Sequence, residues 1–203
     1  MSDVQPQATR ERLVQAATAL IEEGGYAAAS VAAIAQRAGV ATGALYRHFP
    51  SKADLFVEVF RSAAERELEA MRAAAARAGS FGERFEAVIE TYARSALRNR
   101  RAAWALVYEP VDPLVDAERL AYRREYREGM AELLRTGISE REIPDQDVDL
   151  AAAAVVGAIA EALVGPLSPV AGETAPEGSI VGALVGFCRQ AIGSAAVRGA
   201  GPR

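Results

Sequence analysis

The chain has 203 residues, of which 51% are hydrophobic and 25% are charged, and its formal net charge is -4. This length allows one large or two small domains, and the hydrophobic share is sufficient for a substantial core. The net negative charge excludes a uniformly basic coat for nucleic acid but not a local basic face. Cys188 is the only cysteine and His48 the only histidine. An intramolecular disulfide, a cysteine or histidine metal cage and a Ser-His-Asp triad away from His48 are therefore excluded.

The N-terminal segment begins with a polar stretch over residues 1–8, which lacks the apolar run of a signal peptide. We expect a mobile arm there and a cytoplasmic protein. An amphipathic helix is predicted over residues 9–23, because its apolar residues recur at helical spacing. Gly24 and Gly25 are expected to end this helix. The apolar stripe consists of Leu13, Ala16, Ala17, Leu20 and Ile21.

Residues 30–49 carry the pattern of two short helices joined by a tight turn. Ser30 suits the N-cap of the first helix, since its hydroxyl can accept a hydrogen bond from a first-turn amide. Gly39 follows at the position where helices commonly end in the left-handed conformation. The second helix is predicted over residues 42–48 and buries Leu45. This pattern is typical of a helix-turn-helix, whose second helix enters the major groove of DNA.

The segment AGVATGALYRHFPSKADLF, residues 38–56, resembles the DNA-binding signature of TetR-type (TetR/AcrR family) transcriptional repressors. The resemblance covers about residues 9–69 and implies an N-terminal DNA-binding domain over them. Ala41 stands where a capping serine is frequent in the family. Ala44, predicted to face outward, stands where a hydroxyl is common. Because each change removes a possible hydrogen bond, an alternative stays open: a helical interaction scaffold with a degenerate helix-turn-helix.

The outward-facing residues of the second helix are its candidate DNA contacts. The resemblance implies that Thr42 and Gly43 approach base edges and that Tyr46 and His48 contact phosphates. For Arg47, reading a guanine and contacting a phosphate both remain open. A lysine and the free amides at the start of the next helix suit a further phosphate. The predicted DNA-binding residues are Ser30, Thr42, Gly43, Ala44, Tyr46, Arg47, His48 and Lys52.

A long helix is predicted from residue 52 through residue 77, ending at Gly79, followed by a second domain over residues 80–193. At about 1.5 Å per residue this helix is roughly 40 Å long, which suits a lever between two domains. The predicted fold class is all-α, with a helix-turn-helix domain joined by the long helix to a helical ligand-binding and dimerisation domain. The helices of the second domain are predicted after a capping box of Ser80 and Glu83, around Trp104, over 114–136 with Gly137 as its end, over 148–164 after Asp145 or Asp147, and over 179–192.

Aromatic residues of the middle helices are candidates for a ligand pocket. Rings with polar tips suit a site that is apolar but orients its ligand, although each ring singly also fits an ordinary core. The resemblance implies an inducer pocket in this domain. Glu161 is a lone acid within an apolar helix. Because an unpaired buried carboxylate is costly, three alternatives stay open: the side chain is exposed, it pairs with an arginine of a partner, or it binds a cationic ligand. The candidate ligand-binding residues are Phe85, Tyr92, Trp104, Tyr108, Tyr122, Tyr126 and Glu161.

The last two predicted helices carry more apolar surface than one small domain buries, which indicates a partner. The resemblance implies a symmetric four-helix dimer interface made by these helices, matching a palindromic operator. The alternative is that both helices only complete an intramolecular core. Cys188 is expected to be an inert buried thiol. The candidate interface residues are Val155, Val156, Ile159, Leu163, Val181, Leu184, Val185 and Cys188.

These observations favour a ligand-responsive DNA-binding regulator, most simply a repressor that a small-molecule inducer releases from a palindromic operator by a population shift. An enzyme with an accessory helix-turn-helix is disfavoured, because the sequence has no glycine-rich phosphate loop and no metal-ligand spacing. We expect no catalytic residue, no metal, no cofactor and no membrane association. The expected partners are double-stranded DNA, the inducer and a second copy of the chain.

Overall fold

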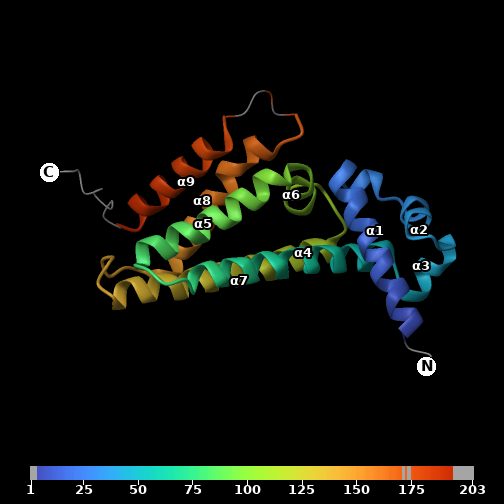
Figure 1. The fold of residues 1–203 in the computed structure, drawn as a ribbon, viewed down its shortest axis with the longest axis horizontal. Coiled ribbons are helices and arrows are strands. Elements are labelled where there is room, and N and C mark those ends of the chain that lie inside the picture. The colour runs from blue at the N-terminus through green and yellow to red at the C-terminus, as the bar shows by residue number, and fades with distance from the viewer. Residues whose placement is uncertain (1–3, 171, 173–174, 194–203) are drawn as a thin grey trace. The chain divides into compact units, whose positions relative to one another are not determined.

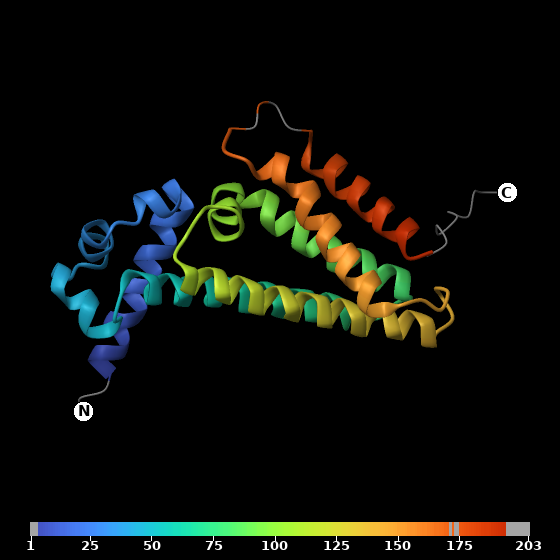
Figure 2. The ribbon, with the colours of Figure 1, turned by 180° about the vertical axis from the view of Figure 1, so that it is seen from behind.

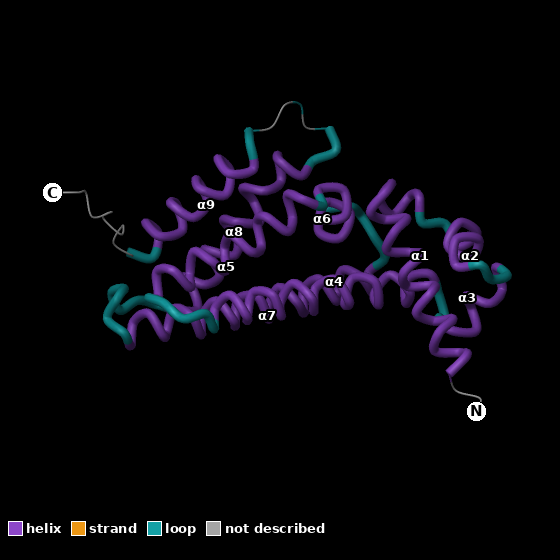
Figure 3. The backbone as a smooth tube through the Cα atoms, viewed as in Figure 1, coloured by secondary structure: helices purple, strands orange, loops and turns teal. Residues whose placement is uncertain are grey.

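A computed structural model describes residues 4–170, 172 and 175–193. Within this part of the chain every regular element is an α-helix (Figures 1 and 3), which confirms the predicted fold class. The helices are α1 (Val4–Ala28), α2 (Val31–Ala38), α3 (Thr42–His48), α4 (Lys52–Ala75), α5 (Phe81–Arg98), α6 (Arg100–Val107), α7 (Pro113–Ser139), α8 (Val148–Leu167) and α9 (Glu177–Ala191).

The chain divides into two compact units, and their boundaries differ from those of the predicted domains. Besides residues 4–66, unit 1 contains residues 98–122 and 167–170. Unit 1 thus adds α6 and the first part of α7 to the first three helices and most of α4. Unit 2 contains residues 67–97, residues 123–166 and, among the residues that follow, the described residues 172 and 175–193.

Unit 1 is built around the inner face of α1. Leu13 and Ala17 of the predicted apolar stripe have no exposed surface, and the helix packs against α2, α3 and α6. Ile34 of α2 and Leu45 of α3 are equally buried in the same core. Since burying one such aliphatic side chain contributes about 1.5–3 kcal/mol, this core rather than helix propensity stabilises the short helices α2 and α3.

The turn between α2 and α3 forms as the sequence predicts. The Ser30 hydroxyl accepts a hydrogen bond from the Ala33 amide (3.2 Å), which caps the start of α2. Gly39 follows α2 with a left-handed φ of 66°, a conformation that a residue with a side chain adopts only under strain. The Ser51 hydroxyl likewise accepts a hydrogen bond from the Asp54 amide (3.2 Å) and caps α4.

The first helix is longer than predicted. α1 begins at Val4, so the expectation of a mobile arm is wrong for residues 4–8. Pro6 is compatible with this helix because the first-turn amides have no intrahelical partner to lose. The predicted interruption is present at Gly25, with φ 74° and ψ -170°, but the helix continues beyond it to Ala28.

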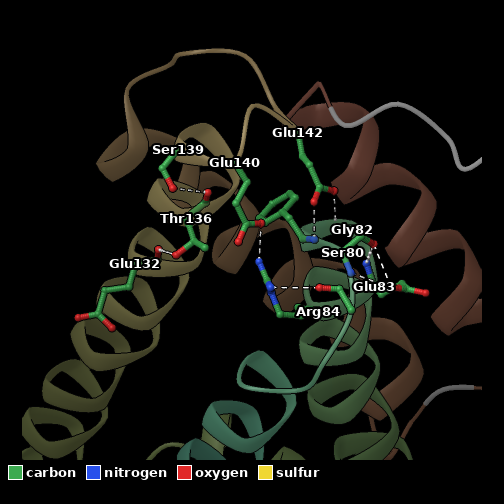
Figure 4. Close-up of polar contacts among 11 residues, drawn as sticks. Ser80, Gly82, Glu83, Arg84, Glu132, Thr136, Ser139, Glu140 and Glu142 are labelled. Atoms are coloured by element: carbon green, nitrogen blue, oxygen red, sulfur yellow. Dashed lines mark hydrogen bonds and ion pairs between the residues drawn. The ribbon is translucent and has the colours of Figure 1, made fainter.

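The N-terminus of α5 in unit 2 is capped by two carboxylates (Figure 4). In the predicted capping box, the Ser80 hydroxyl accepts from the Glu83 amide (3.2 Å) and the Glu83 carboxylate accepts from the Ser80 amide (2.8 Å). The Glu142 carboxylate, from the loop after α7, accepts from the amides of Phe81 (2.9 Å) and Gly82 (3.4 Å). Amides that a helix leaves unpaired at its start thus have partners here, and the loop is fastened to α5.

Several helix ends differ from the predicted positions. α4 ends at Ala75 instead of continuing through residue 77, and α8 extends to Leu167. α7 does not end at Gly137 but continues to Ser139. An added Cβ atom at Gly137 would lie 2.6 Å from Cδ2 of Phe81. This glycine therefore allows the close approach of a buried ring and does not terminate the helix.

Replacing Gly137 by alanine is expected to lower the midpoint of thermal unfolding. The Phe81 ring has no exposed surface and stacks on Phe85, with the ring centroids 5.6 Å apart. Overpacking it costs about 1–3 kcal/mol, more than the roughly 1 kcal/mol that alanine gains over glycine in helix propensity. Gly129 in the same helix is the control, since nothing lies within 4 Å of an added Cβ atom there. Gly129→Ala should raise the midpoint; a rise for both variants would contradict the packing role of Gly137.

The helices α8 and α9 run antiparallel in unit 2 (Figures 1 and 2), and the Gln146 side-chain amide before α8 donates to the Ile192 carbonyl after α9 (3.1 Å). The Asp147 carboxylate caps α8, as one of the two predicted candidates, by accepting from the Asp149 amide (3.1 Å). Among the described residues, α8 is the one helix whose length and composition would suit a membrane span, with a mean hydropathy of 2.0. Core helices pass the same test, and 28% of its most apolar window is buried within the chain.

Two ion pairs fasten α9 along α5 within unit 2. Arg94 of α5 pairs with Glu177 at the start of α9 (3.2 Å), and Glu86 of α5 pairs with Arg189 near its end. Cys188 has no exposed surface, as predicted for an inert thiol, and burial raises its pKa to about 11. α9 is thus held to the chain by its inner face at both ends.

Candidate nucleic-acid interface

The helix α3 presents one exposed face formed by most of the predicted DNA contacts. Thr42, Gly43 and Arg47 are exposed, and Tyr46 is 55% exposed. A large aromatic side chain that takes no part in a core is suited to contact a partner. Ser30 is exposed as well, and its hydroxyl is engaged in the cap of α2.

The prediction that Ala44 faces outward is wrong. Its side chain is 4% exposed and lies next in sequence to the fully buried Leu45. α3 has 7 residues and packs against both α1 and α2, so its inner face is wide enough to bury two adjacent positions. His48 lies one turn beyond Ala44 on the same side of the helix and is half-buried. Ala41 makes no side-chain cap at the start of α3, as its departure from the resembled pattern predicts.

Lys52 is held at the first position of α4. Its Nζ atom lies 4.8 Å from the centre of the Phe56 ring, a cation–π contact that fixes the long side chain. Partial burial lowers the pKa of Lys52. The ammonium group lies at the N-terminal, positive end of the helix dipole. The charge of the lysine and the positive helix end both favour binding of an anion such as a phosphate.

Several other basic side chains of unit 1 are paired with acids. Arg37 near the end of α2 pairs with Glu23 (2.5 Å), and this arginine lowers the pKa of the Glu23 carboxyl. Arg47, in contrast, makes no hydrogen bond or ion pair within the described part of the chain. On α3 and at the start of α4 the cationic side chains are thus Arg47 and Lys52. The further ion pairs within the described part of unit 1 are Arg10–Glu58, Arg61–Glu118, Arg101–Glu109 and Arg119–Asp116.

Sequence reasoning missed one residue that the fold brings to this region. Arg10 of α1 forms an ion pair with Glu58 of α4 (2.9 Å), and its guanidinium carbon lies 4.9 Å from the centre of the Phe49 ring at the end of α3. The sequence offered one signal for Arg10. It lies three residues before Leu13, and this helical spacing places its charged side chain on the same side of the helix as the apolar stripe.

The predicted ligand-binding aromatics belong to both units. In unit 1 the rings of Trp104 and Tyr108 lie 5.0 Å apart, and Tyr122 packs edge-on against Phe60. In unit 2 the Tyr92 and Tyr126 rings meet edge-on at 6.0 Å. Phe85, also in unit 2, has no exposed surface and belongs to the core stack with Phe81. Each unit thus brings some of these rings together in pairs.

A carboxylate accompanies the aromatic pair of unit 2. The Tyr126 hydroxyl donates a hydrogen bond to Glu67 Oε2 (2.8 Å). Burial raises the pKa of the Glu67 carboxyl, partly offset by this hydrogen bond. Glu161, the acid that sequence reasoning selected, is instead exposed on α8. Tyr92, Tyr126 and Glu67 therefore form the polar and aromatic group of unit 2.

A pocket of about 300 Å³ lies on the surface of unit 2. Its charged groups are largely engaged with residues outside the lining: Arg84 pairs with Glu140 (2.6 Å), and Glu86 pairs with Arg189. None of the predicted aromatics lines it. The lining residues are Arg77, Ala78, Glu83, Arg84, Glu86, Ala87 and Glu90.

The residues predicted for the dimer interface face mainly into the chain's own core. Val156 and Val185 are half-buried. The other six are at most 5% exposed: Val155, Ile159, Leu163, Val181, Leu184 and Cys188.

The outer face of the same two helices carries different apolar residues. Leu150 of α8 is 68% exposed and Phe187 of α9 is 56% exposed. Because both helices are apolar on most sides, the sequence could not tell their inner face from their outer face. Small residues complete the outer face: Ala154, Gly157, Ala162, Gly182 and Ala183 are exposed.

A short exposed helix follows a glycine turn here, and a cation is held at the start of the next helix. This arrangement is typical of DNA-binding proteins of the helix-turn-helix class. Residues 13–59 match the family described as "Bacterial regulatory proteins, tetR family", and residues 78–163 match "Tetracyclin repressor-like, C-terminal domain". The chain belongs to the TetR family of bacterial regulatory proteins.

Two relatives match over most of this chain. The HTH-type transcriptional repressor KstR2 of Rhodococcus jostii is 31% identical over 70% of this chain and 72% of its own length. The crystal structure of a TetR/AcrR family regulator from Thermobifida fusca is 30% identical, with a TM-score of 0.70, and the match covers 88% of this chain and 95% of that one. Both matches extend well beyond the helix-turn-helix.

Other similarities are limited in extent or in identity. The KstR repressor of Mycolicibacterium smegmatis is 45% identical over 36% of this chain. The match spans only 34% of that protein's length. FadR of Bacillus subtilis, whose crystal structure contains stearoyl-CoA, is 22% identical with a TM-score of 0.77 over 90% of this chain and 98% of that one. This last similarity concerns the fold alone.

Proposed function

We propose that the chain is a cytoplasmic, homodimeric transcriptional repressor that binds a palindromic operator and is released by a small-molecule inducer. The observation that carries the proposal is the exposed face of α3, with Tyr46 55% exposed and Lys52 held at the start of α4. Family membership supports the same assignment. The protein acts by binding, and no catalytic residue is assigned to it.

The proposed base-reading residues are Thr42 and Gly43 at the start of α3. The N-terminal residues of a recognition helix are those that contact base edges. At Gly43 an added Cβ atom would meet nothing within 4 Å in the chain, so internal packing does not require a glycine there. Close approach to a base edge supplies a reason for it. Tyr46, Arg47 and Lys52 then lie where phosphate contacts fix the register of the protein on the duplex.

The proposed dimer is formed by the outer faces of α8 and α9. Only 28% of the most apolar window of α8 is buried within the chain, and an apolar face of this extent is normally covered by a partner. At Gly157, Gly182 and Gly186 an added Cβ atom would meet nothing within 4 Å. Such glycines are accounted for when a helix of a second copy packs closely against them. Leu150 and Phe187 are the large side chains that the partner would bury.

The proposed inducer acts by a population shift, because it binds better to the dimer state that does not fit the operator. Within unit 2, the Tyr92–Tyr126 pair and the Glu67 carboxylate supply the ring faces and the polar group that such a ligand needs. Stearoyl-CoA, which is present in the FadR crystal structure, is the first probe to test. The experiment is its effect on the affinity of the dimer for DNA.

DNA binding is tested by selecting duplexes that bind the purified full chain from a random library. The selected duplex and the DNA upstream of the protein's own gene are then titrated by fluorescence anisotropy across a salt series. We expect a common palindromic sequence, a Kd of about 10⁻⁸ M or below, and an affinity that falls linearly with salt on logarithmic axes. Failure to enrich any sequence would overturn the repressor assignment and favour the scaffold.

A further inference from the structure

Arg10 connects three helices of unit 1. Its two terminal nitrogens bind the two oxygens of the Glu58 carboxylate, at 3.0 Å (Nη1 to Oε1) and 2.9 Å (Nη2 to Oε2). This two-point geometry between α1 and α4 is the strong form of an arginine–carboxylate pair. The pairing raises the pKa of Arg10 and lowers the pKa of Glu58, so both groups stay charged throughout the neutral range.

The same guanidinium covers the residue that ends α3. Its carbon lies 4.9 Å from the centre of the Phe49 ring, within the range of a cation–π contact. Phe49 is 3% exposed, and its amide donates to the Leu45 carbonyl at the end of α3 (2.9 Å). Arg10 is therefore fixed between Phe49, the residue that follows α3, and Glu58 in the second turn of α4.

We propose that Arg10 is a positioning residue for DNA binding: its contacts with Glu58 and Phe49 fix the connection between α3 and α4, and it does not itself neutralise a phosphate. The inference rests on the proposed function. Tyr46 and Lys52 lie on the two sides of the connection that Arg10 fixes, and their separation determines whether both reach the DNA backbone together. A small displacement of either group loses much of the benefit of a preorganised site.

The opposite role, a direct phosphate contact, predicts a different response at Glu58. If Arg10 bound a phosphate, Glu58→Gln would remove a competing carboxylate and a negative charge near DNA, and binding would become tighter. If Arg10 acts through the pair, Glu58→Gln releases the arginine from α4 and binding becomes weaker. The sign of the change at a residue that carries no positive charge thus separates the two roles.

The Arg10→Lys variant separates geometry from charge. A lysine side chain at this position would keep the positive charge, but an ammonium group cannot make the two-point pair of a guanidinium. We expect Arg10→Lys to weaken DNA binding nearly as much as Arg10→Gln, whereas a role that needs only charge would be rescued. Arg12 supplies the matched control, because it is exposed on the same helix and, among the described residues, its guanidinium donates to the Thr9 hydroxyl alone (3.3 Å).

The experiment titrates the wild-type chain and the variants Arg10→Gln, Arg10→Lys, Glu58→Gln, Arg10→Gln with Glu58→Gln, and Arg12→Gln onto the selected duplex across a salt series. We expect each single variant of the pair to weaken binding about tenfold, the value for loss of roughly 1.4 kcal/mol. The double variant should be no weaker than the single ones, since both remove one interaction. The dependence of affinity on salt should be unchanged for Arg10→Gln, and Arg12→Gln should change affinity less than threefold.

Three results would overturn the proposal: tighter binding by Glu58→Gln, rescue by Arg10→Lys, or a salt dependence for Arg10→Gln that falls by about two ions per dimer, as loss of two phosphate contacts requires. Circular dichroism and sedimentation of each variant exclude unfolding as the cause of weaker binding. The wild-type titration keeps the two proposals apart. A wild-type chain that selects no duplex refutes the proposed function, whereas normal binding with unaffected variants refutes only the role of Arg10.

Discussion

The variant with both Tyr46→Ala and Lys52→Ala is expected to lose operator binding by about 1,000-fold while remaining a folded dimer. Two contacts in each protomer give four in the dimer, and at about 1 kcal/mol each their loss amounts to about 4 kcal/mol. Tyr46 is 55% exposed and takes no part in the core of unit 1. The Lys52 contact with the Phe56 ring that is also lost is worth about 0.5–1 kcal/mol, too little to unfold the chain, so the loss falls mainly on binding. Anisotropy on the selected duplex measures the affinity, and sedimentation measures the dimer.

The control for this variant removes an exposed apolar side chain and an exposed cation elsewhere. Leu114 is 53% exposed and Arg123 is exposed, and both lie on α7. Leu114→Ala combined with Arg123→Ala should leave affinity within threefold of the wild-type value. Full binding by the Tyr46 and Lys52 variant would show that α3 and the start of α4 do not form the DNA-binding face.

Replacing Phe187 by glutamate is expected to dissociate the proposed dimer. Two-fold symmetry would bury two such carboxylates in one interface, at a cost of several kcal/mol. Sedimentation should give a mass of 21.4 kDa, that of one chain, at concentrations where the wild-type chain has twice that mass. Operator affinity should fall by about 10²–10⁴, because the second half-site is then no longer bound at a high effective concentration.

The control for the dimer prediction is Leu120→Glu. Leu120 of α7 is 62% exposed, close to the exposure of Phe187, and it belongs to neither α8 nor α9. The same charge at this position should leave both the mass and the affinity unchanged. A wild-type mass for Phe187→Glu would place the dimer interface elsewhere.

The helix-turn-helix could be predicted from local chemistry. Ser30 and Gly39 act within their own turn of chain, as a cap and as a left-handed residue, so their roles follow from sequence neighbours alone. Ala44 was misplaced because its burial depends on how widely α3 contacts α1 and α2, which is a tertiary property. Gly137 was misread in the same way: only the Phe81 ring, 56 positions earlier in the chain, explains why it is a glycine.

The dimer face shows the limit of hydrophobic periodicity. A helix with apolar residues on one side reveals its inner face, but α8 is apolar nearly all round, and the sequence pattern carries no direction. The structure assigns Val155 and Leu163 to the inner face and leaves Leu150 outside. The ion pairs between α9 and α5 could not be predicted from local sequence either, since Arg189 and Glu86 are 103 positions apart.

The symmetric DNA-binding dimer is tested by a hydroxyl-radical footprint of the protein on the selected duplex. Two copies of α3 related by two-fold symmetry should protect two equivalent segments on one face of the DNA, with centres about 34 Å apart or a multiple of that spacing. The Phe187→Glu variant should lose both protections together at the concentrations where it is monomeric. A single protected segment, or unrelated segments on the two half-sites, would contradict a symmetric dimer that reads DNA through α3.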